Sequence, residues 1–282
     1  SSYQHTVELF GTPTAIFTLK DKRKLVSYGR DFWLTFNEGK LVNVTNQNRW
    51  LSNEFLNMHA FDERFEAQSW RVLDKVTFNM PLVEAGLTLK ATQDEHHRII
   101  LRQNAQVLTL QGIAESVIHN QVPEYNVGFF SLSNSAYKSG VLDISINNKS
   151  NELLKKFMDV KSSKFDRERL RSLAIGEVWS DENTSMLVMD NNMVVDLSGK
   201  IINKVYLLDS VFLKQHMNTK PQWQVGEFTQ GQFFDDVKQR LGQDIFATKD
   251  MLEVSTDNYI QELFFIGSQN GGVLHATEIT IL

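Results

Sequence analysis

The chain has 282 residues, of which 41% are hydrophobic, 22% charged and 11% aromatic. This is ordinary globular composition, and it excludes a disordered, collagen-like or coiled-coil protein. With 29 Lys and Arg against 34 Asp and Glu, the net charge is -5, so the molecule as a whole is not expected to be attracted to nucleic acid or anionic membranes. The absence of Cys excludes disulfides, thiolate nucleophiles and Cys-based metal sites.

The N-terminal segment has neither a basic start nor the apolar run of a signal peptide. No stretch approaches the ~20 apolar residues that a membrane-spanning helix needs. The sequence therefore predicts a protein without a membrane span, located in the cytoplasm or in a virion.

Four segments share the pattern of a β-hairpin, in which two apolar runs flank a short Asn, Gly, Ser or Asp break. Such a break suits a tight turn because these residues tolerate a positive φ angle. Four hairpins imply about eight strands. The segments are residues 32–44, 98–110, 185–197 and 263–277.

Apolar residues in alternation indicate further strands. Residues 70–78 show this pattern, and so do Leu87, Leu89 and Ala91. Residues 201–208 form a more continuous apolar run, which is typical of a buried strand.

Two segments show helical spacing. Residues 151–175 contain two apolar stripes, each preceded by a serine, and end before Gly176. In residues 229–241, Thr229 and Gln232 have the spacing of a capping box at a helix start. We therefore expect helical insertions near 151–175 and 229–241.

These elements predict a β-rich α+β fold with antiparallel, sandwich-like sheets built from hairpins. The shift in character near residue 151 suggests a mainly β region over 1–150 and an α+β region over 151–282, which could also form one continuous domain. A β-propeller is the minor alternative. The segment LFFIGSQNGGVLHATE resembles one blade of the quinoprotein-type or pilus-tip adhesin propellers.

The common catalytic motifs are absent from the sequence. There is no GxSxG nucleophile elbow, no HExxH zinc motif, no GxxxxGK[ST] phosphate loop and no GxGxxG at the start of a helix. We therefore assign no catalytic residue, no metal ligand and no cofactor from the sequence.

An enzyme remains as an alternative, in the form of a metal-dependent phosphodiesterase or nuclease. Such enzymes hold Mg²⁺ with carboxylates and orient the phosphate with a lysine. The run Asp94-Glu95-His96-His97 also contains metal-ligating residue types, although a polar turn between two strands is the simpler explanation. Two carboxylate and lysine sets fit the nuclease pattern: Asp143 with Asp159 and Lys161, and Asp31 with Glu38 and Lys40.

The predicted helix pair is basic in an otherwise acidic chain. Several of its cations fall on one helical face, which suits a phosphate or an acidic partner surface. A solvated face braced by ion pairs, such as Lys164 with Glu168, is the simpler explanation. The candidate anion- or partner-binding patch consists of Lys155, Lys156, Lys164, Arg167 and Arg171.

Adjacent aromatic residues recur in the predicted strands, where neighbours point to opposite faces. One member of each pair must then face a second sheet or a protein partner. We therefore expect a non-enzymatic structural or protein-interaction subunit of a larger homo- or hetero-oligomeric assembly, of virion, phage or mobile-element type. Nucleic-acid binding through the basic helix pair is the weaker alternative. The aromatic pairs are Phe32-Trp33, Phe129-Phe130, Phe233-Phe234 and Phe264-Phe265.

Overall fold

The computed structural model divides the chain into two compact units. Unit 1 comprises residues 1–49 and 60–140, and unit 2 comprises residues 50–59 and 141–282. The residues that the structure describes are 1–19, 22–66, 70–114, 123–137, 167–180, 184–198, 201–213, 223–242, 245–267 and 272–282.

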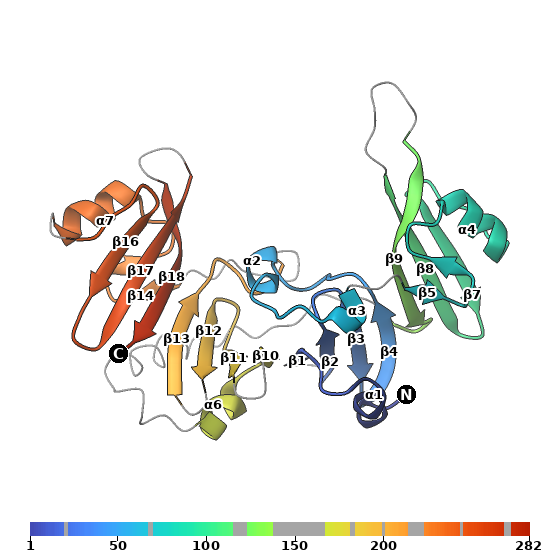
Figure 1. Ribbon diagram of the computed structural model, residues 1–282, viewed down its shortest axis with the longest axis horizontal. Helices are drawn as coiled ribbons and strands as arrows, with labels where there is room; N and C mark the ends of the chain where they lie inside the picture. Colours follow the sequence, from blue (N-terminus) through green and yellow to red (C-terminus); the bar gives the residue numbers. More distant parts are fainter. Residues whose placement is uncertain are drawn as a thin grey trace. The chain divides into compact units, whose positions relative to one another are not determined.

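Unit 1 is built on an antiparallel sheet, in which the described strands follow the order β1-β2-β3-β4-β9-β8-β7 (Figure 1). A four-strand meander comes first, a short hairpin and a helix follow, and a three-strand meander ends on β9, which pairs with β4. The elements are α1 (Tyr3–Phe10), β1 (Ala15–Thr18), β2 (Lys24–Tyr28), β3 (Phe32–Asn37), β4 (Lys40–Thr45), α3 (Glu63–Glu66), β5 (Arg71–Val72), β6 (Val76–Thr77), α4 (Leu82–Leu89), β7 (Arg98–Gln103), β8 (Gln106–Ala114) and β9 (Tyr125–Asn134).

Unit 2 has an antiparallel sheet with the strand order β10-β11-β12-β13-β18-β17-β16. Here β18 ends the second meander and pairs with β13. The elements are α2 (Asn53–Leu56), α6 (Arg167–Leu173), β10 (Gly176–Trp179), β11 (Thr184–Val188), β12 (Met193–Ser198), β13 (Ile201–Leu207), β14 (Gln224–Val225), β15 (Phe228–Thr229), α7 (Phe234–Leu241), β16 (Met251–Ser255), β17 (Tyr259–Ile266) and β18 (Val273–Ile281).

The two units repeat one topology. Apart from the one-turn helices α3 in unit 1 and α2 in unit 2, each runs helix, four strands, two-stranded hairpin, helix, three strands. Each closes by pairing its last strand with its fourth. The irregularities repeat as well. The β3–β4 and β12–β13 pairs each contain a register shift, and so do the β8–β9 and β17–β18 pairs. Because bulges occur at specific positions within a fold, their recurrence gives a residue-by-residue correspondence between the units.

The segments around the two-stranded hairpin and the helix that follows it are also alike in the two units. Trp70 precedes β5 and Trp223 precedes β14, and the carbonyl of each accepts a bond from a backbone N–H after the hairpin. The residues before the helices, Pro81 and Phe233, each bridge to the last strand of their unit. The units therefore share a scaffold although their sequences differ at most positions.

The four predicted hairpins are confirmed as β3–β4, β7–β8, β11–β12 and β17–β18. Their turns explain why local sequence was sufficient. Glu38 and Gly39 have φ angles of 49° and 75°, and Asn104 and Ala105 have 47° and 61°. Positive φ at both central residues matches the twist of the flanking strands.

In each unit, a hydrophobic core lies between the sheet and the helix that follows the short hairpin. In unit 1, Leu82 and Ala85 of α4 pack with Ile99, Leu110 and Val127. In unit 2, the corresponding helix α7 inserts Phe234 and Val237 among the apolar side chains of β12, β13, β17 and β18. Burying these apolar faces contributes most of the stability that holds helix and sheet together.

The predicted strand through Leu87 and Leu89 is wrong, because α4 covers these residues. Leu82, Ala85 and Gly86 are the buried positions of α4, and their spacing is helical. The helix expected near 229–241 begins at Phe234 rather than at Thr229, which belongs to β15. A backbone bond from the Phe234 N–H to the Gly272 carbonyl takes the place of the predicted side-chain cap.

The structure is β-rich, with large antiparallel sheets and few helices, as predicted. Of the expected insertion near 151–175, the structure describes residues 167–175, and Arg167–Leu173 is helical. Residues 151–166 lie outside the described part of the chain. The described strands form no closed sheet, and neither the sandwich nor the propeller is confirmed.

The correspondence between α4 and α7 predicts which residues of α4 the fold requires. Val83 and Leu87 are 69% and 77% exposed, and their counterparts in α7 are Asp235 and Gln239. We expect the double variant Val83→Asp, Leu87→Gln to change the free energy of unfolding by less than about 0.5 kcal/mol in urea titrations.

Ala85→Asp is the matched control, because Ala85 is fully buried. It should cost more than about 3 kcal/mol, since it buries an unpaired polar group. A large loss in the Val83 and Leu87 variant would contradict the correspondence between the two helices.

Candidate functional site

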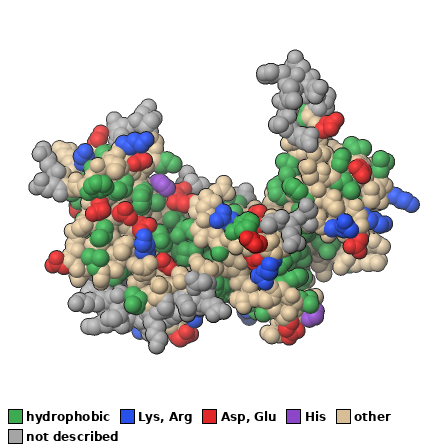
Figure 2. All heavy atoms as spheres, in the orientation of Figure 1, with side chains coloured by type: hydrophobic (Ala, Val, Ile, Leu, Met, Phe, Trp, Pro, Cys, Tyr) green, Lys and Arg blue, Asp and Glu red, His purple; other side chains and the backbone are tan. Residues whose placement is uncertain are grey.

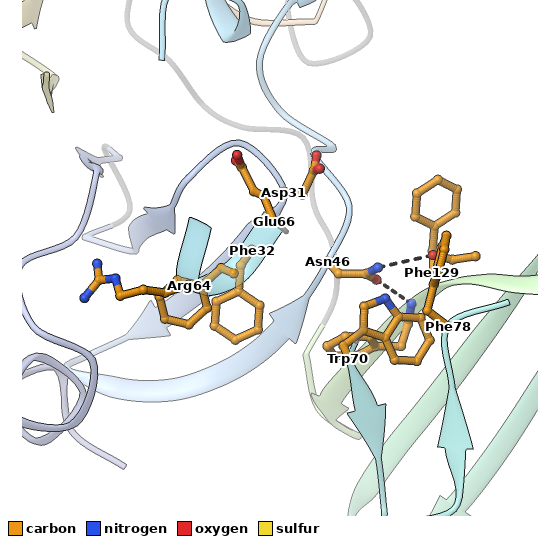
Figure 3. Close-up of a pocket in the computed structure, with 11 residues that line it drawn as sticks. Asp31, Phe32, Asn46, Arg64, Glu66, Trp70, Phe78 and Phe129 are labelled. Carbon is orange, nitrogen blue, oxygen red and sulfur yellow. Dashed lines mark hydrogen bonds between the residues drawn. The ribbon is translucent and has the colours of Figure 1, made fainter. Parts of the chain in front are cut away.

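A pocket of about 440 Å³ opens in unit 1 beside the edge of the β3 and β9 strands (Figure 3). Its volume falls within the range of small-ligand and side-chain pockets. Eleven residues line it: Asp31, Phe32, Asn46, Arg64, Phe65, Glu66, Trp70, Phe78, Gly128, Phe129 and Phe130.

Aromatic side chains make up most of the pocket wall. On one side, Phe32 and Phe65 stack with their ring centres 5.0 Å apart. On the other side, Trp70 packs against Phe130 at 4.9 Å and against Phe78 at 6.2 Å. Phe78 is 45% exposed, so part of this aromatic surface is open to solvent. The pocket therefore offers ring faces to an apolar or cationic group.

Asn46, which follows β4, binds the backbone of β9 beside the pocket. Its amide nitrogen donates to the Gly128 carbonyl at 3.2 Å, and its carbonyl oxygen accepts from the Phe130 N–H at 2.6 Å. Gly128 is the extra residue of the β8–β9 bulge. A side chain there would collide with Ile113, so glycine lets the strands approach at this point.

Two carboxylates, from Asp31 and Glu66, lie on the same side of the pocket (Figure 3). Burial raises the pKa of the Asp31 carboxyl, against the opposing charge of Arg30, although one side of Asp31 stays open to solvent. Burial is also the main cause that raises the pKa of Glu66, and the neighbouring Asp31 charge adds to it. Both groups would thus be stabilised by a cation.

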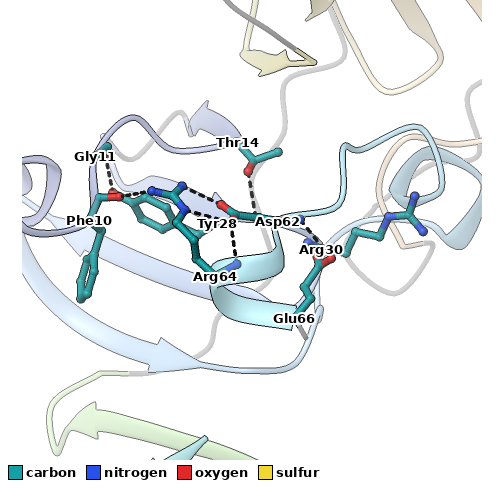
Figure 4. A network of polar contacts seen from close by, with 9 residues as sticks. Phe10, Gly11, Thr14, Tyr28, Arg30, Asp62, Arg64 and Glu66 are labelled. Carbon is teal, nitrogen blue, oxygen red and sulfur yellow. Dashed lines mark hydrogen bonds and ion pairs between the residues drawn. The ribbon is translucent and has the colours of Figure 1, made fainter. Parts of the chain in front are cut away.

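A polar network fixes Glu66 and the neighbouring Arg64 (Figure 4). Glu66 accepts bonds from the backbone N–H groups of Arg30 and Asp62. Arg64 forms a two-point contact with Asp62, at 2.7 and 2.9 Å, and donates to the Phe10 carbonyl at 2.8 Å. This pairing holds the pKa of Asp62 below its usual range and engages the Arg64 guanidinium away from the two carboxylates at the pocket.

Gly29 allows Glu66 to reach the β2–β3 turn. Gly29 has a φ of 68°, and an added Cβ would lie 2.6 Å from the Glu66 carboxyl carbon. We expect Gly29→Ala to lower the free energy of unfolding by about 2–3 kcal/mol, because it combines backbone strain with loss of the Glu66 bonds.

Gly39→Ala is the matched control. Gly39 has a similar φ of 75° but no atom within 4 Å of the added Cβ, so only the strain of about 1 kcal/mol applies. Equal losses for both variants in urea unfolding would show that Glu66 does not occupy this position.

The corresponding place in unit 2 carries different chemistry. The extra residue of the β17–β18 bulge is His275, whose Nδ1 lies 4.0 Å from Glu54 Oε1. Asp209 adjoins them and accepts a bond from Gln230 Nε2 at 2.6 Å. Burial raises the pKa of Glu54 to about 7, with the Asp209 charge as the second cause.

The raised pKa of Glu54 predicts a pH dependence of stability. The folded state keeps a proton up to about pH 7 that the unfolded chain releases near its ordinary pKa of 4.5, so the free energy of unfolding falls across this range. After allowance for solvent screening, Glu54→Gln should raise stability by about 1–2 kcal/mol at pH 8 and leave it nearly unchanged at pH 4.

Urea unfolding at both pH values measures this difference. Glu227→Gln provides the control, because it makes the same substitution at an exposed side chain and should have only a small effect on stability. A Glu54→Gln effect that does not depend on pH would contradict the assignment.

The candidate basic patch is described only at its C-terminal end. Lys155, Lys156 and Lys164 lie outside the described residues, and Arg167 begins α6. Arg171 contacts Glu177 at 2.7 Å and Glu168 at 3.3 Å, so a partner would have to compete with two carboxylates. On the face shown in Figure 2, Lys and Arg side chains are interspersed with Asp and Glu. The patch stays a prediction.

The described residues that were considered for metal chemistry form no metal site. Asp94 accepts from the His96 and Arg98 backbone and pairs with the Arg98 guanidinium at 2.8 Å, as in a structured turn. His97 stacks on Tyr125. Within the described residues, no group of three His, Asp or Glu side chains is arranged to hold a metal ion. Asp143, Asp159 and Lys161 lie outside them.

Comparison with known proteins gives no relative: no family model, no curated protein and no solved structure matches this chain. Across the described parts of the chain, none of the helices has the length and apolar character to cross a membrane.

Only some of the residues that line the pocket were singled out from the sequence. Phe32 and Phe129 were identified as members of aromatic pairs that need a second neighbour, and both line the pocket. Asp31 was considered only as a nuclease carboxylate, and Glu66, Trp70 and Asn46 were not found as site residues. Their convergence depends on the β4–β9 pairing, which no local pattern reveals.

Proposed function

We propose that the protein is a non-enzymatic interaction subunit of a larger assembly, and that the aromatic pocket of unit 1 receives a segment of a partner protein. The observation that carries this proposal is that the scaffold does not need three of the pocket's aromatic residues, Phe32, Phe78 and Phe129. Unit 2 forms the same strand order with other residues at these positions, although it keeps a tryptophan in the place of Trp70.

Matching hydrogen bonds and bulges identify the residues of unit 2 that stand at the positions of three pocket aromatic residues of unit 1. Met193 stands where unit 1 has Phe32, because both pair with the residue before the preceding turn. Ala276 corresponds to Phe129 through the β-bulges. Gln230 corresponds to Phe78 through its bond to the tryptophan carbonyl.

Aromatic residues that a fold does not need for its stability are typical of surfaces that bind other proteins. They bury large areas at a low cost in conformational entropy and are enriched at protein interfaces. A partly exposed ring such as Phe78 loses apolar contact with water when a partner covers it, which favours association.

The wider setting is a prediction from the sequence. We expect a homo- or hetero-oligomeric partner, in an assembly of virion, phage or mobile-element type. Binding of nucleic acid through the basic patch is the weaker proposal, because Arg171 already has two acidic neighbours.

Peptide display on the purified full chain tests the docking site. Peptides selected by the wild-type protein should lose at least about tenfold in affinity for Phe78→Ala, because that ring contributes to a buried contact. Binding is measured by fluorescence anisotropy with labelled peptides.

Phe61→Ala is the control, since Phe61 is 57% exposed in the same unit and lies outside the pocket. It should leave the affinity unchanged. Selected peptides that bind Phe78→Ala and the wild-type protein equally would contradict docking at this pocket.

A further inference from the structure

The Asp31 carboxylate lines the pocket, and its counterpart in unit 2 has a different role. By its place before β12, Asn192 corresponds to Asp31, which stands before β3. The Asn192 amide donates to the carbonyls of Leu208 and Asp209, each at 2.9 Å, and so ties the segment after β13 to the turn.

Asp31 cannot make these bonds, because an ionised carboxylate has no hydrogen to donate. It forms no hydrogen bond with another described residue, and it lines the pocket instead. A partly desolvated carboxylate without a donor favours a ligand that brings both a positive charge and N–H groups.

Glu66 reinforces this preference. Its oxygens face the N–H groups of Arg30 and Asp62, and in unit 2 Asp190 plays the same part by accepting from the N–H groups of Asn192 and Met193. In unit 2, a residue of the turn itself, Asp190, accepts these bonds. In unit 1, the Arg30 N–H of the β2–β3 turn donates to Glu66, which lies outside the turn, so this turn has a second carboxylate beside Asp31. The two negative charges lie close enough to raise the pKa of Glu66.

The nearby cations do not neutralise the pair fully. Arg64 is bound to Asp62 and to the Phe10 carbonyl. Arg30 counteracts the pKa rise of both carboxyls, yet burial remains the larger cause for each. The aromatic walls beside them, Phe32 and Phe65, suit a cation through their ring faces.

We infer that the pocket selects a partner segment with a lysine or arginine next to an aromatic residue, the cation contacting Asp31 and Glu66 while the ring packs on the aromatic wall. This inference rests on the proposed docking function and specifies its partner.

Two short probes separate the cation from the ring. N-acetyl-Phe-Lys-amide carries both, and N-acetyl-Phe-norleucine-amide has the same apolar length without the charge. Each is titrated to millimolar concentration into the ¹⁵N-labelled full chain, with the Trp70 indole signal as the readout and Trp70→Phe used for its assignment.

We expect the lysine probe to bind wild-type protein about fivefold more tightly than the norleucine probe, as one partly exposed ion pair allows. The preference should disappear in Asp31→Asn and persist in Asp74→Asn, which removes an exposed carboxylate of the same unit outside the pocket.

Equal binding of both probes to the wild-type protein, or an unchanged preference in Asp31→Asn, would overturn the inference and leave the docking function standing. Failure of both probes to shift Trp70, together with selected peptides indifferent to Phe78→Ala, would overturn the docking function itself.

Discussion

The pairing of the last strand of each unit with its fourth strand is the constraint on which the structure depends. In unit 1, Val44 of β4 lies opposite Leu132 of β9, and in unit 2, Val205 of β13 lies opposite Ile279 of β18. These pairs join segments more than 70 residues apart, so each requires the closure of a long loop that only the burial of a shared core can compensate. The bulge beside each pairing then directs one residue toward the place where the hairpin and the sheet meet.

The two units show how one scaffold supports two chemistries. At the bulge, unit 1 has Gly128 in an aromatic pocket, and unit 2 has His275 beside Glu54 and Asp209. Because the strand order and the positions of the register shifts are the same, these differences separate what folding needs from what a site needs. The two buried positions that the helices share, Leu82 and Ala85 in α4 and Phe234 and Val237 in α7, are apolar in both units. The outward positions of Val83 and Leu87 and several residues of the pocket wall differ. This contrast supports a role in recognition for the aromatic residues of unit 1.

Prediction from the sequence succeeded where structure is local. The turns at Glu38-Gly39 and Asn104-Ala105 define their hairpins within a few residues, and the β-rich class follows from them. The strand expected through Leu87 failed because alternation over five residues does not distinguish a strand from one turn of an amphipathic helix. The repeat was not found from the sequence, although Trp70-x-Val72 and Trp223-x-Val225 each begin a hairpin that ends in a threonine. Two short matches are weak evidence without the bulges that align them.

The sequence by itself determined the composition class, the hairpins, and the presence of aromatic residues in excess of one sheet face. Only the tertiary structure decided that Asp31, Glu66, Trp70 and Phe129 line one pocket. They come from separate segments, which the bond from the Arg30 N–H to Glu66 and the β4–β9 pairing bring together. It also decided the ionisation of Glu54, whose raised pKa arises from burial and from Asp209. Hydrogen bonds within a turn act over a few residues and can be read along the chain. Desolvation, stacking and charge repulsion act through space, and they depend on neighbours that the order of residues does not name.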